Sequence, residues 1–314
     1  MKILCYEPLF LKKNILKLNK YFDLCFSKNN SKESDQIIGI FTRLSNFLSF
    51  NDLKKFKNLK YIISPTTGLN HLELNLLSNK IKIFSLKSSD KRMQKVNSTS
   101  EFTITLVLLA ARKIVDFITC KKFNPNRYQF KTFQFKNLTV GIIGFGRIGS
   151  KVAQILKKIG FKVLIYEKDK KKILSTFNFV SLKKLLRNSD IISIHINYNN
   201  KNKNFINKKN LIFLKKESVL INTSRGEVIC EKDLVNFLKN EKISKAFLDV
   251  ISDEQNQFQN KKNLLFTLSK DKLVIFPHLG GATIDAMHLT ENIVIDDFVK
   301  FIDKKYTEKN LLND

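Results

Sequence analysis

Three glycines occur at a spacing suited to binding a phosphate-containing cofactor. Gly144, Gly146 and Gly149 form a GxGxxG pattern between an apolar run at 139–143 and a stretch of helical periodicity at 147–159. The first glycine permits a tight turn, the second lets the backbone approach a pyrophosphate, and the third lets the helix pack closely on the strand. The first turn of such a helix presents unpaired N–H groups to the phosphates. The pattern therefore predicts a dinucleotide site.

A carboxylate follows the next apolar run, 162–166, at a position that supports this prediction. Glu167 lies 18 residues beyond Gly149, close to the roughly 20 residues that separate the loop from the acid that binds the adenosine ribose. A carboxylate there accepts hydrogen bonds from the ribose hydroxyls and repels a 2′-phosphate, which predicts NAD rather than NADP. The alternative is that Glu167 only ends a strand. The nearby Lys168, Lys170 and Lys171 would weaken the exclusion of NADP.

The elements that must position these residues alternate between strands and helices. In the first hundred residues, strands are expected at 2–6, 36–40, 59–63 and 81–85, and helices at 9–18 and 52–56. One long apolar helix is expected at 98–119. A second series has strands at 139–143, 162–166, 190–195, 218–222, 244–249 and 273–276, with helices at 147–159, 182–188, 231–240 and 284–305. Alternation of this kind predicts two α/β domains with parallel sheets.

Four further motifs follow the glycine loop in order. They are SDIISIH at 189–195, LINTSRG at 220–226, FLDV at 247–250 with Glu254 beyond it, and PHLGGAT at 277–283. In this order they resemble the D-isomer-specific 2-hydroxyacid dehydrogenases, the family of phosphoglycerate dehydrogenase and glycerate dehydrogenase. The resemblance covers nearly the whole chain.

The resemblance implies a fold and a domain organisation. The fold is expected to be α/β with two Rossmann-like doubly wound domains. A flavodoxin-like substrate domain would comprise 1–96 and 285–314, and an inserted NAD-binding domain would comprise 97–284. The active site is expected in the cleft between them. The apolar helix 98–119 resembles the family's dimerisation helix, so a homodimer is expected.

The resemblance also assigns three catalytic residues, Arg225, Glu254 and His278. Their chemistry fits the reaction, because oxidation of an alcohol by hydride loss requires removal of the hydroxyl proton. His278 would take that proton and return it in the reverse direction. Glu254 would hold the imidazole and stabilise its cationic form. Arg225 offers a planar fork of donors for a substrate carboxylate and the adjacent carbonyl oxygen.

Other positions carry over as cofactor or substrate contacts. The expected cofactor contacts are Thr67, Gly144, Gly146, Arg147, Ile148, Gly149, Glu167, Ile196, Thr223, Ser224, Asp249, Gly280 and Gly281. Asp249 would meet the nicotinamide carboxamide. Substrate contacts would be Arg43, Thr67 and Gly68, with backbone N–H groups of the loop SPTTGLNHL at 64–72 holding the carboxylate. A turn after a strand is the alternative for this loop, and a surface arginine for Arg43. His71 and His288 are expected to be structural.

Composition limits the class of protein. No apolar run reaches the roughly 18 residues of a membrane span, and no signal-peptide core begins the chain. The four cysteines, Cys5, Cys25, Cys120 and Cys230, have no paired spacing, which predicts free thiols in the cytoplasm. No metal site is expected.

The net charge of +28 could indicate nucleic-acid binding or an anionic substrate. The basic residues are mostly lysines scattered along the chain, and coding bias toward A and T accounts for that pattern. A nucleic-acid surface would concentrate them in a patch, so no nucleic-acid partner is expected. The expected substrate is a small anionic 2-hydroxy or 2-oxo acid, with 3-phosphoglycerate or glycerate/hydroxypyruvate the leading candidates. The alternative is an NAD-binding, corepressor-like regulatory protein without significant turnover.

Overall fold

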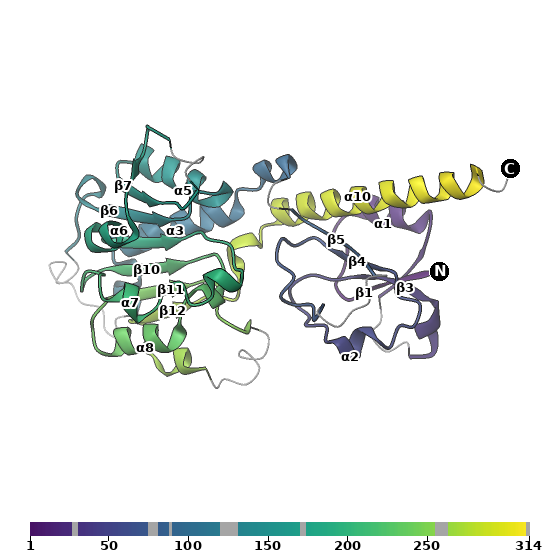
Figure 1. Cartoon of the computed structure of the whole chain (residues 1–314), viewed down its shortest axis with the longest axis horizontal. Helices are drawn as coiled ribbons and strands as arrows, with labels where there is room; N and C mark the ends of the chain where they lie inside the picture. Colours follow the sequence, from purple (N-terminus) through teal and green to yellow (C-terminus); the bar gives the residue numbers. More distant parts are fainter. Residues whose placement is uncertain are drawn as a thin grey trace. The chain divides into compact units, whose positions relative to one another are not determined.

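The computed structural model describes residues 1–26, 31–74, 81–87, 90–119, 131–169, 174–254 and 263–311. The chain divides into two compact units (Figure 1). Unit 1 comprises Met1–Val96 and Thr283–Asp314, and unit 2 comprises Asn97–Ala282. The second boundary lies two residues before the expected start at 285. Cys120, Lys170 and Lys171 lie outside the described residues.

Unit 1 contains a parallel five-stranded sheet in the order β2-β1-β3-β4-β5, which is the flavodoxin-like order. Its strands are β1 (Lys2–Cys5), β2 (Asp23–Cys25), β3 (Ile37–Phe41), β4 (Tyr61–Ser64) and β5 (Lys82–Ser85). The sequence did not predict β2, which has three residues and only one neighbour, β1.

Alternating side chains give this sheet two apolar faces, as expected for strands buried on both sides. Ile3 and Ile63 pack with residues of α1 (Lys12–Asn19) and α10 (Ile284–Leu311). Their neighbours, such as Leu4 and Ile62, pack in a second cluster that includes Leu53 of α2 (Phe50–Leu53). Figure 1 shows α1 and α10 on one side of the sheet and α2 on the other. The C-terminal helix is therefore part of the core that begins with the first strand.

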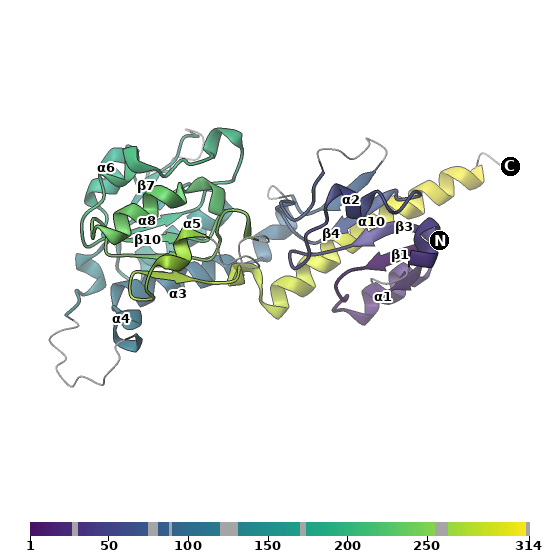
Figure 2. The ribbon, with the colours of Figure 1, turned by 90° about the horizontal axis from the view of Figure 1, so that it is seen from below.

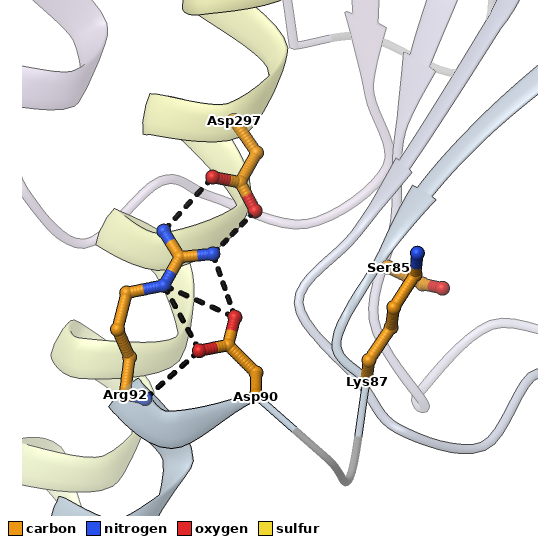
Figure 3. Close-up of a pocket in the computed structure, with 5 residues that line it drawn as sticks. All are labelled: Ser85, Lys87, Asp90, Arg92 and Asp297. Atoms are coloured by element: carbon orange, nitrogen blue, oxygen red, sulfur yellow. Dashed lines mark hydrogen bonds and ion pairs between the residues drawn. The ribbon is translucent and has the colours of Figure 1, made fainter.

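Ion pairs join the segment before the first unit boundary to α10. Arg92, in the 3₁₀ turn Lys91–Lys95, donates to Asp90 and to Asp297 of α10, each at 2.6 Å. These residues line a hollow of about 290 Å³ together with Ser85 and Lys87 (Figure 3). Because the Arg92 side chain is 43% exposed, the pairs add little to stability.

Unit 2 contains a parallel seven-stranded sheet in the order β12-β11-β10-β9-β6-β7-β8. The strands are β6 (Thr139–Ile143), β7 (Lys162–Tyr166), β8 (Asn178–Phe179), β9 (Ile191–Ile194), β10 (Val219–Asn222), β11 (Lys245–Leu248) and β12 (Leu273–Ile275). The strand order reverses direction between β6 and β9. In a doubly wound sheet this switch point, at the carboxyl ends of the strands, is where a dinucleotide binds.

Helices cover both faces of this sheet. One face packs with α3 (Ser98–Ala111) and α5 (Arg147–Lys158). The other packs with α6 (Leu182–Asn188), α7 (Lys208–Leu211) and α8 (Glu231–Lys239). Within the described residues, none of the helices is long and apolar enough to cross a bilayer.

The prediction of one helix over 98–119 was wrong. The helix ends at Ala111, and a second helix, α4 (Ile114–Ile118), follows. Lys113 separates them with the left-handed φ of 50°, which interrupts the i→i−4 ladder. Lys245 of β11 pairs with Asp116 of α4 at 3.0 Å, and this contact joins the second helix to the sheet. Figure 2 shows α4 as a separate short helix.

Candidate active site

The glycine loop connects β6 to α5. Gly144 has a φ of +95°, which side chains rarely adopt, and a Cβ on Gly149 would stand 2.1 Å from the Gly144 carbonyl oxygen. Backbone conformation and close contacts within the protein therefore explain why glycine occupies these two positions. A Cβ on Gly146, at the N-cap of α5, would meet no described atom within 4 Å. Open space in front of a helix N-terminus fits a pyrophosphate. Arg147 and Ile148, both expected contacts, form the first turn of α5.

Glu167 follows β7 and faces the glycine loop. Its two carboxylate oxygens accept hydrogen bonds from the backbone N–H groups of Phe145, at 2.7 Å, and Asp169, at 3.0 Å. The carboxylate is thus fixed beside the loop, and each oxygen keeps a lone pair. This placement is compatible with the expected contact to a ribose.

His195, at the end of β9, lies directly beneath the glycine turn. Its N–H donates to the Ile143 carbonyl at 2.7 Å, and a Cβ on Gly144 would stand 2.6 Å from the His195 carbonyl oxygen. Burial lowers the pKa of His195 to about 3, so the imidazole is neutral at physiological pH. Its Nε2 bonds to the Ser193 hydroxyl at 2.9 Å. Sequence reasoning gave His195 no role. The available signal was its position as a polar residue at the end of the expected strand 190–195. Ile196 also touches this turn.

Arg225 lies in the loop after β10, and Asn222 shapes that loop. The Asn222 Oδ1 accepts from the Ser224 N–H at 3.0 Å and from the Ser224 hydroxyl at 2.7 Å, and its Nδ2 donates to the Arg225 carbonyl at 2.8 Å. Burial lowers the pKa of Arg225, against the opposing effect of Glu254. The neighbouring Thr223 hydroxyl bonds to Thr103 of α3 at 2.8 Å. Asn222 is a second residue that sequence reasoning missed.

Glu254 and His278 form a hydrogen-bonded pair. The Glu254 Oε2 lies 3.0 Å from the His278 Nδ1, and both side chains are about one-quarter exposed (25% and 23%). The pairing leaves the other imidazole nitrogen, Nε2, free of hydrogen bonds to described residues. His278 has a φ of 56°, a strained value for a non-glycine residue that points to a functional constraint.

Asp249 holds His278 in this conformation. Its carbonyl accepts from the His278 N–H at 3.0 Å, and its carboxylate accepts from the N–H groups of Leu279, at 2.6 Å, and Gly280, at 2.9 Å. Burial raises the pKa of Asp249, and the bond from Gly280 opposes this. A Cβ on Gly280 would stand 2.7 Å from the Asp249 Oδ2, whereas one on Gly281 would meet no described atom within 4 Å.

The predicted residues of unit 2 thus gather at the carboxyl ends of its strands. The Arg225 loop follows β10, Asp249 and Glu254 follow β11, and His278 follows β12. An imidazole whose second nitrogen is held by a carboxylate can exchange a proton with an alcohol or carbonyl oxygen. Arg225, which is half-buried and interacts with Glu254, can bind a carboxylate.

The loop 64–72 of unit 1 is ordered by its own hydroxyl groups. The Ser64 hydroxyl bonds to the Thr66 hydroxyl at 2.9 Å and to the Nε2 of buried His71 at 3.2 Å, and the Thr66 hydroxyl donates to the Gly68 carbonyl at 2.8 Å. Thr67 is exposed. Among the described residues, the N–H groups of Thr67 and Gly68 donate to no other protein group. Two adjacent free N–H groups can bind an anion.

Arg43, the remaining predicted substrate contact, bonds to two carboxylates inside unit 1. Its guanidinium donates to the Glu291 carboxylate of α10 at 2.6 Å, and the two side chains are 12% and 0% exposed. Its backbone N–H donates to Glu7 at 2.9 Å. Glu291 also accepts from the N–H groups of Phe10 and Leu11 and from the Asn14 amide. The structure therefore gives Arg43 a second role, in fastening α10.

Comparisons with known proteins identify the family. The family model for the NAD-binding domain of the D-isomer specific 2-hydroxyacid dehydrogenases matches residues 104–280. An aromatic 2-oxoacid reductase of Clostridium sporogenes is 32% identical over 275 residues, which cover 82% of this chain and 80% of that protein.

Solved structures share the fold over almost the whole chain. D-lactate dehydrogenase from Aquifex aeolicus, solved with NAD and lactic acid, has a TM-score of 0.76 and 24% identity, covering 99% of this chain and 96% of that one. An acyclic imino acid reductase, solved with NADPH and D-Arg, has a TM-score of 0.75 and 25% identity, covering 97% and 98%. The chain belongs to the D-isomer specific 2-hydroxyacid dehydrogenase family, and it is an NAD-dependent oxidoreductase that acts on CH–OH groups.

Proposed function

We propose that this protein catalyses reversible hydride transfer between NAD(H) and a small D-2-hydroxy or 2-oxo acid, with Arg225, Glu254 and His278 as its catalytic residues. The observation that carries the proposal is the Glu254–His278 pair at 3.0 Å. It lies at the strand ends of a unit that matches an NAD-binding domain. The free imidazole nitrogen is the group that such a reaction requires.

In the direction of reduction, the cofactor supplies a hydride, with its electron pair, to the carbonyl carbon C2 of the oxo acid. The carbonyl π bond breaks, and the oxygen takes the proton from the His278 Nε2, giving the hydroxy acid. Glu254 stabilises the imidazolium before this transfer through its bond to Nδ1. Arg225 binds the substrate carboxylate and polarises the carbonyl oxygen. Oxidation follows the same steps in reverse.

The glycine loop would bind the pyrophosphate through the first turn of α5, which contains Arg147 and Ile148. Glu167 would bind the adenosine ribose, and Ile196, Thr223, Ser224, Gly280 and Gly281 would line the nucleotide. The Asp249 carboxylate already accepts two backbone N–H groups, so its contact to the nicotinamide carboxamide would use its remaining lone pairs. Thr67 would complete the cofactor contacts.

In unit 1, the free N–H groups of Thr67 and Gly68 are proposed to bind the substrate carboxylate. Arg43 is the third proposed substrate contact. Its Nε is buried and has no partner among the described residues, so the contact would be made by the terminal guanidinium nitrogens of a side chain that is 12% exposed. We also propose that unit 1 is the substrate domain, that the protein is a cytoplasmic homodimer, and that 3-phosphoglycerate or glycerate/hydroxypyruvate is its substrate.

The test is consumption of NADH, followed by its absorbance, with a panel of 2-oxo acids. The panel comprises hydroxypyruvate, phosphohydroxypyruvate, glyoxylate, pyruvate, 2-oxoglutarate and phenylpyruvate, the last because of the aromatic 2-oxoacid reductase relative. Turnover of hydroxypyruvate or phosphohydroxypyruvate supports the proposed substrate. Turnover of phenylpyruvate alone would replace that substrate with an aromatic 2-oxo acid. Tight NADH binding with no turnover of any acid would favour a regulatory protein.

A further inference from the structure

Glu231, in the first turn of α8, accepts two hydrogen bonds beside the catalytic loop. One carboxylate oxygen accepts from the Ser252 N–H at 2.6 Å, and the other accepts from the Asn263 side-chain amide at 2.9 Å. Ser252 lies two residues before Glu254. One side chain therefore joins the backbone just before Glu254 to the side chain of Asn263.

The backbone just before Glu254 also packs against the Arg225 loop. A Cβ on Gly226 would stand 1.9 Å from the Ile251 carbonyl carbon and 2.2 Å from the Ser252 nitrogen. The N–H of Ile251 in turn donates to the Glu254 Oε1 at 3.3 Å. The backbone at 251–252 thus lies between Gly226 and Glu231, and it directs the Glu254 carboxylate.

Retaining a carboxylate at this position has a cost. Burial raises the pKa of Glu231, and the bonds from Ser252 and Asn263 oppose that rise. A nearby like charge, Glu227, adds to it. An acid in the first turn of a helix is favourable in general, and this explains a charge at the start of α8. It does not explain why one oxygen bonds to the backbone just before Glu254 and the other to Asn263.

We propose that Glu231 is a positioning residue for the hydride-transfer reaction, which fixes the backbone before Glu254 and thereby the contact of Glu254 with His278. This inference rests on the proposed function for its kinetic consequence, but its geometric consequence can be measured without turnover. Among the described residues, the charged groups that interact with His278 are Glu254 and Asp249, and Arg225 acts on Glu254.

The first measurement is the NMR spectrum of the histidine side chains in the cofactor-free protein at one fixed neutral pH. The sequence has only four histidines, and a His278→Gln spectrum identifies the signal of His278. Three variants are compared with the wild type: Glu231→Gln, Glu254→Gln and their double mutant. Asp233→Asn is the matched control, because Asp233 lies in the same turn of α8 but accepts from the Lys208 N–H of α7 at 2.8 Å.

In Glu231→Gln the ring resonances of His278 are expected to move in the same direction as in Glu254→Gln but less far, because a displaced carboxylate weakens the hydrogen bond at Nδ1. In the double mutant, Glu231→Gln should add no further change, since it acts through Glu254. Asp233→Asn should leave the His278 resonances unchanged. Unchanged His278 resonances in Glu231→Gln, or an equal change in both backgrounds, overturn the proposal.

The second measurement uses the best substrate of the oxo-acid panel. Glu231→Gln should lower kcat about tenfold, with little change in the Kd of NADH or in the KM of the oxo acid. Asn263→Ala, which removes only one of the two bonds, should give a smaller loss and serves if Glu231→Gln fails to fold. Shifted His278 resonances in a protein without turnover support the positioning role and refute the proposed function. Normal turnover in Glu231→Gln refutes the positioning role alone.

Discussion

The backbones of Gly226 and Ile251 approach so closely that a Cβ on the glycine would stand 1.9 Å from the Ile251 carbonyl carbon. This contact brings the loop that carries Arg225 against the loop that carries Glu254. Because the neighbouring atoms are backbone, no side-chain rotation can make room for a methyl group. The arginine and the carboxylate thus owe their proximity to a residue that does no chemistry.

Gly226→Ala should therefore reduce both stability and activity. Overpacking at a rigid site costs about 1–3 kcal/mol, and the displacement of Glu254 should lower kcat further. Chemical unfolding and steady-state kinetics measure the two effects. Gly281→Ala is the control for stability, since its Cβ would meet no described atom. Equal stability of the two variants would show that the approach is not as close as described.

The second and third glycines of the loop should respond differently to alanine. Gly146→Ala should keep the stability of the free protein but weaken NADH binding, because its Cβ points into open space where the pyrophosphate would lie. Gly149→Ala should destabilise the fold, because its Cβ would overlap the Gly144 carbonyl. Thermal unfolding with and without NADH separates the outcomes. Unchanged NADH affinity in Gly146→Ala would place the nucleotide elsewhere.

Asp249→Asn tests the support of the catalytic histidine. An amide keeps one acceptor, so one of the bonds from Leu279 and Gly280 is lost and an NH₂ group faces a backbone N–H. Loss of a buried bond of this kind costs about 1–3 kcal/mol. We expect lower stability and a fall in kcat, because the strained conformation of His278 loses its anchor. Retention of full kcat would mean that Asp249 does not position His278.

His195 makes the stability of unit 2 depend on pH. The folded state takes up a proton on His195 only near pH 3, whereas the unfolded chain takes it up near pH 6.5. Between these values the unfolded state binds more protons, so the contribution is fully present above about pH 6.5 and is lost as the pH falls. The loss approaches about 1.4 kcal/mol per pH unit. Urea unfolding of wild type and His195→Asn at neutral and mildly acid pH should show a smaller acid loss in the variant.

Arg43→Met separates the two roles of Arg43. Breaking a buried ion pair by removing one partner costs about 3–5 kcal/mol, and it leaves the fully buried Glu291 charged without its guanidinium. We expect a marked loss of stability in unit 1. Arg43→Met combined with Glu291→Gln should recover part of that loss. If the double variant is stable but has a raised KM, Arg43 also contacts the substrate.

Much of the fold could be predicted from local sequence. The strands β6 and β7 and the helix α6 have the expected bounds, because apolar runs and capping residues determine them nearby. The break between α3 and α4 could not be predicted, because a lysine rather than glycine adopts the left-handed conformation at 113. The three residues of β2 carry too few apolar positions to show a period.

The candidate site also contains features that the sequence predicted and features that it did not. Spacing alone indicated the glycine loop, and the family resemblance indicated Glu254 and His278, which the structure brings to 3.0 Å. The partners of these residues did not follow from spacing. Glu231 reaches Ser252 across 21 residues, and Arg43 reaches Glu291 across 248. Such contacts depend on how elements pack, which no local pattern encodes.

The interruption of unit 1 by unit 2 has a consequence for synthesis of the chain. The core around Ile3 and Phe22 includes Ile293, Phe298 and Ile302 of α10, which the ribosome produces after unit 2. Unit 2 is continuous, and all of it is made before that helix emerges. Domains fold as units during translation, so the NAD-binding unit can fold while residues 1–96 still lack a helix of their core. This segment thus leaves the ribosome before unit 2 and completes its folding after it.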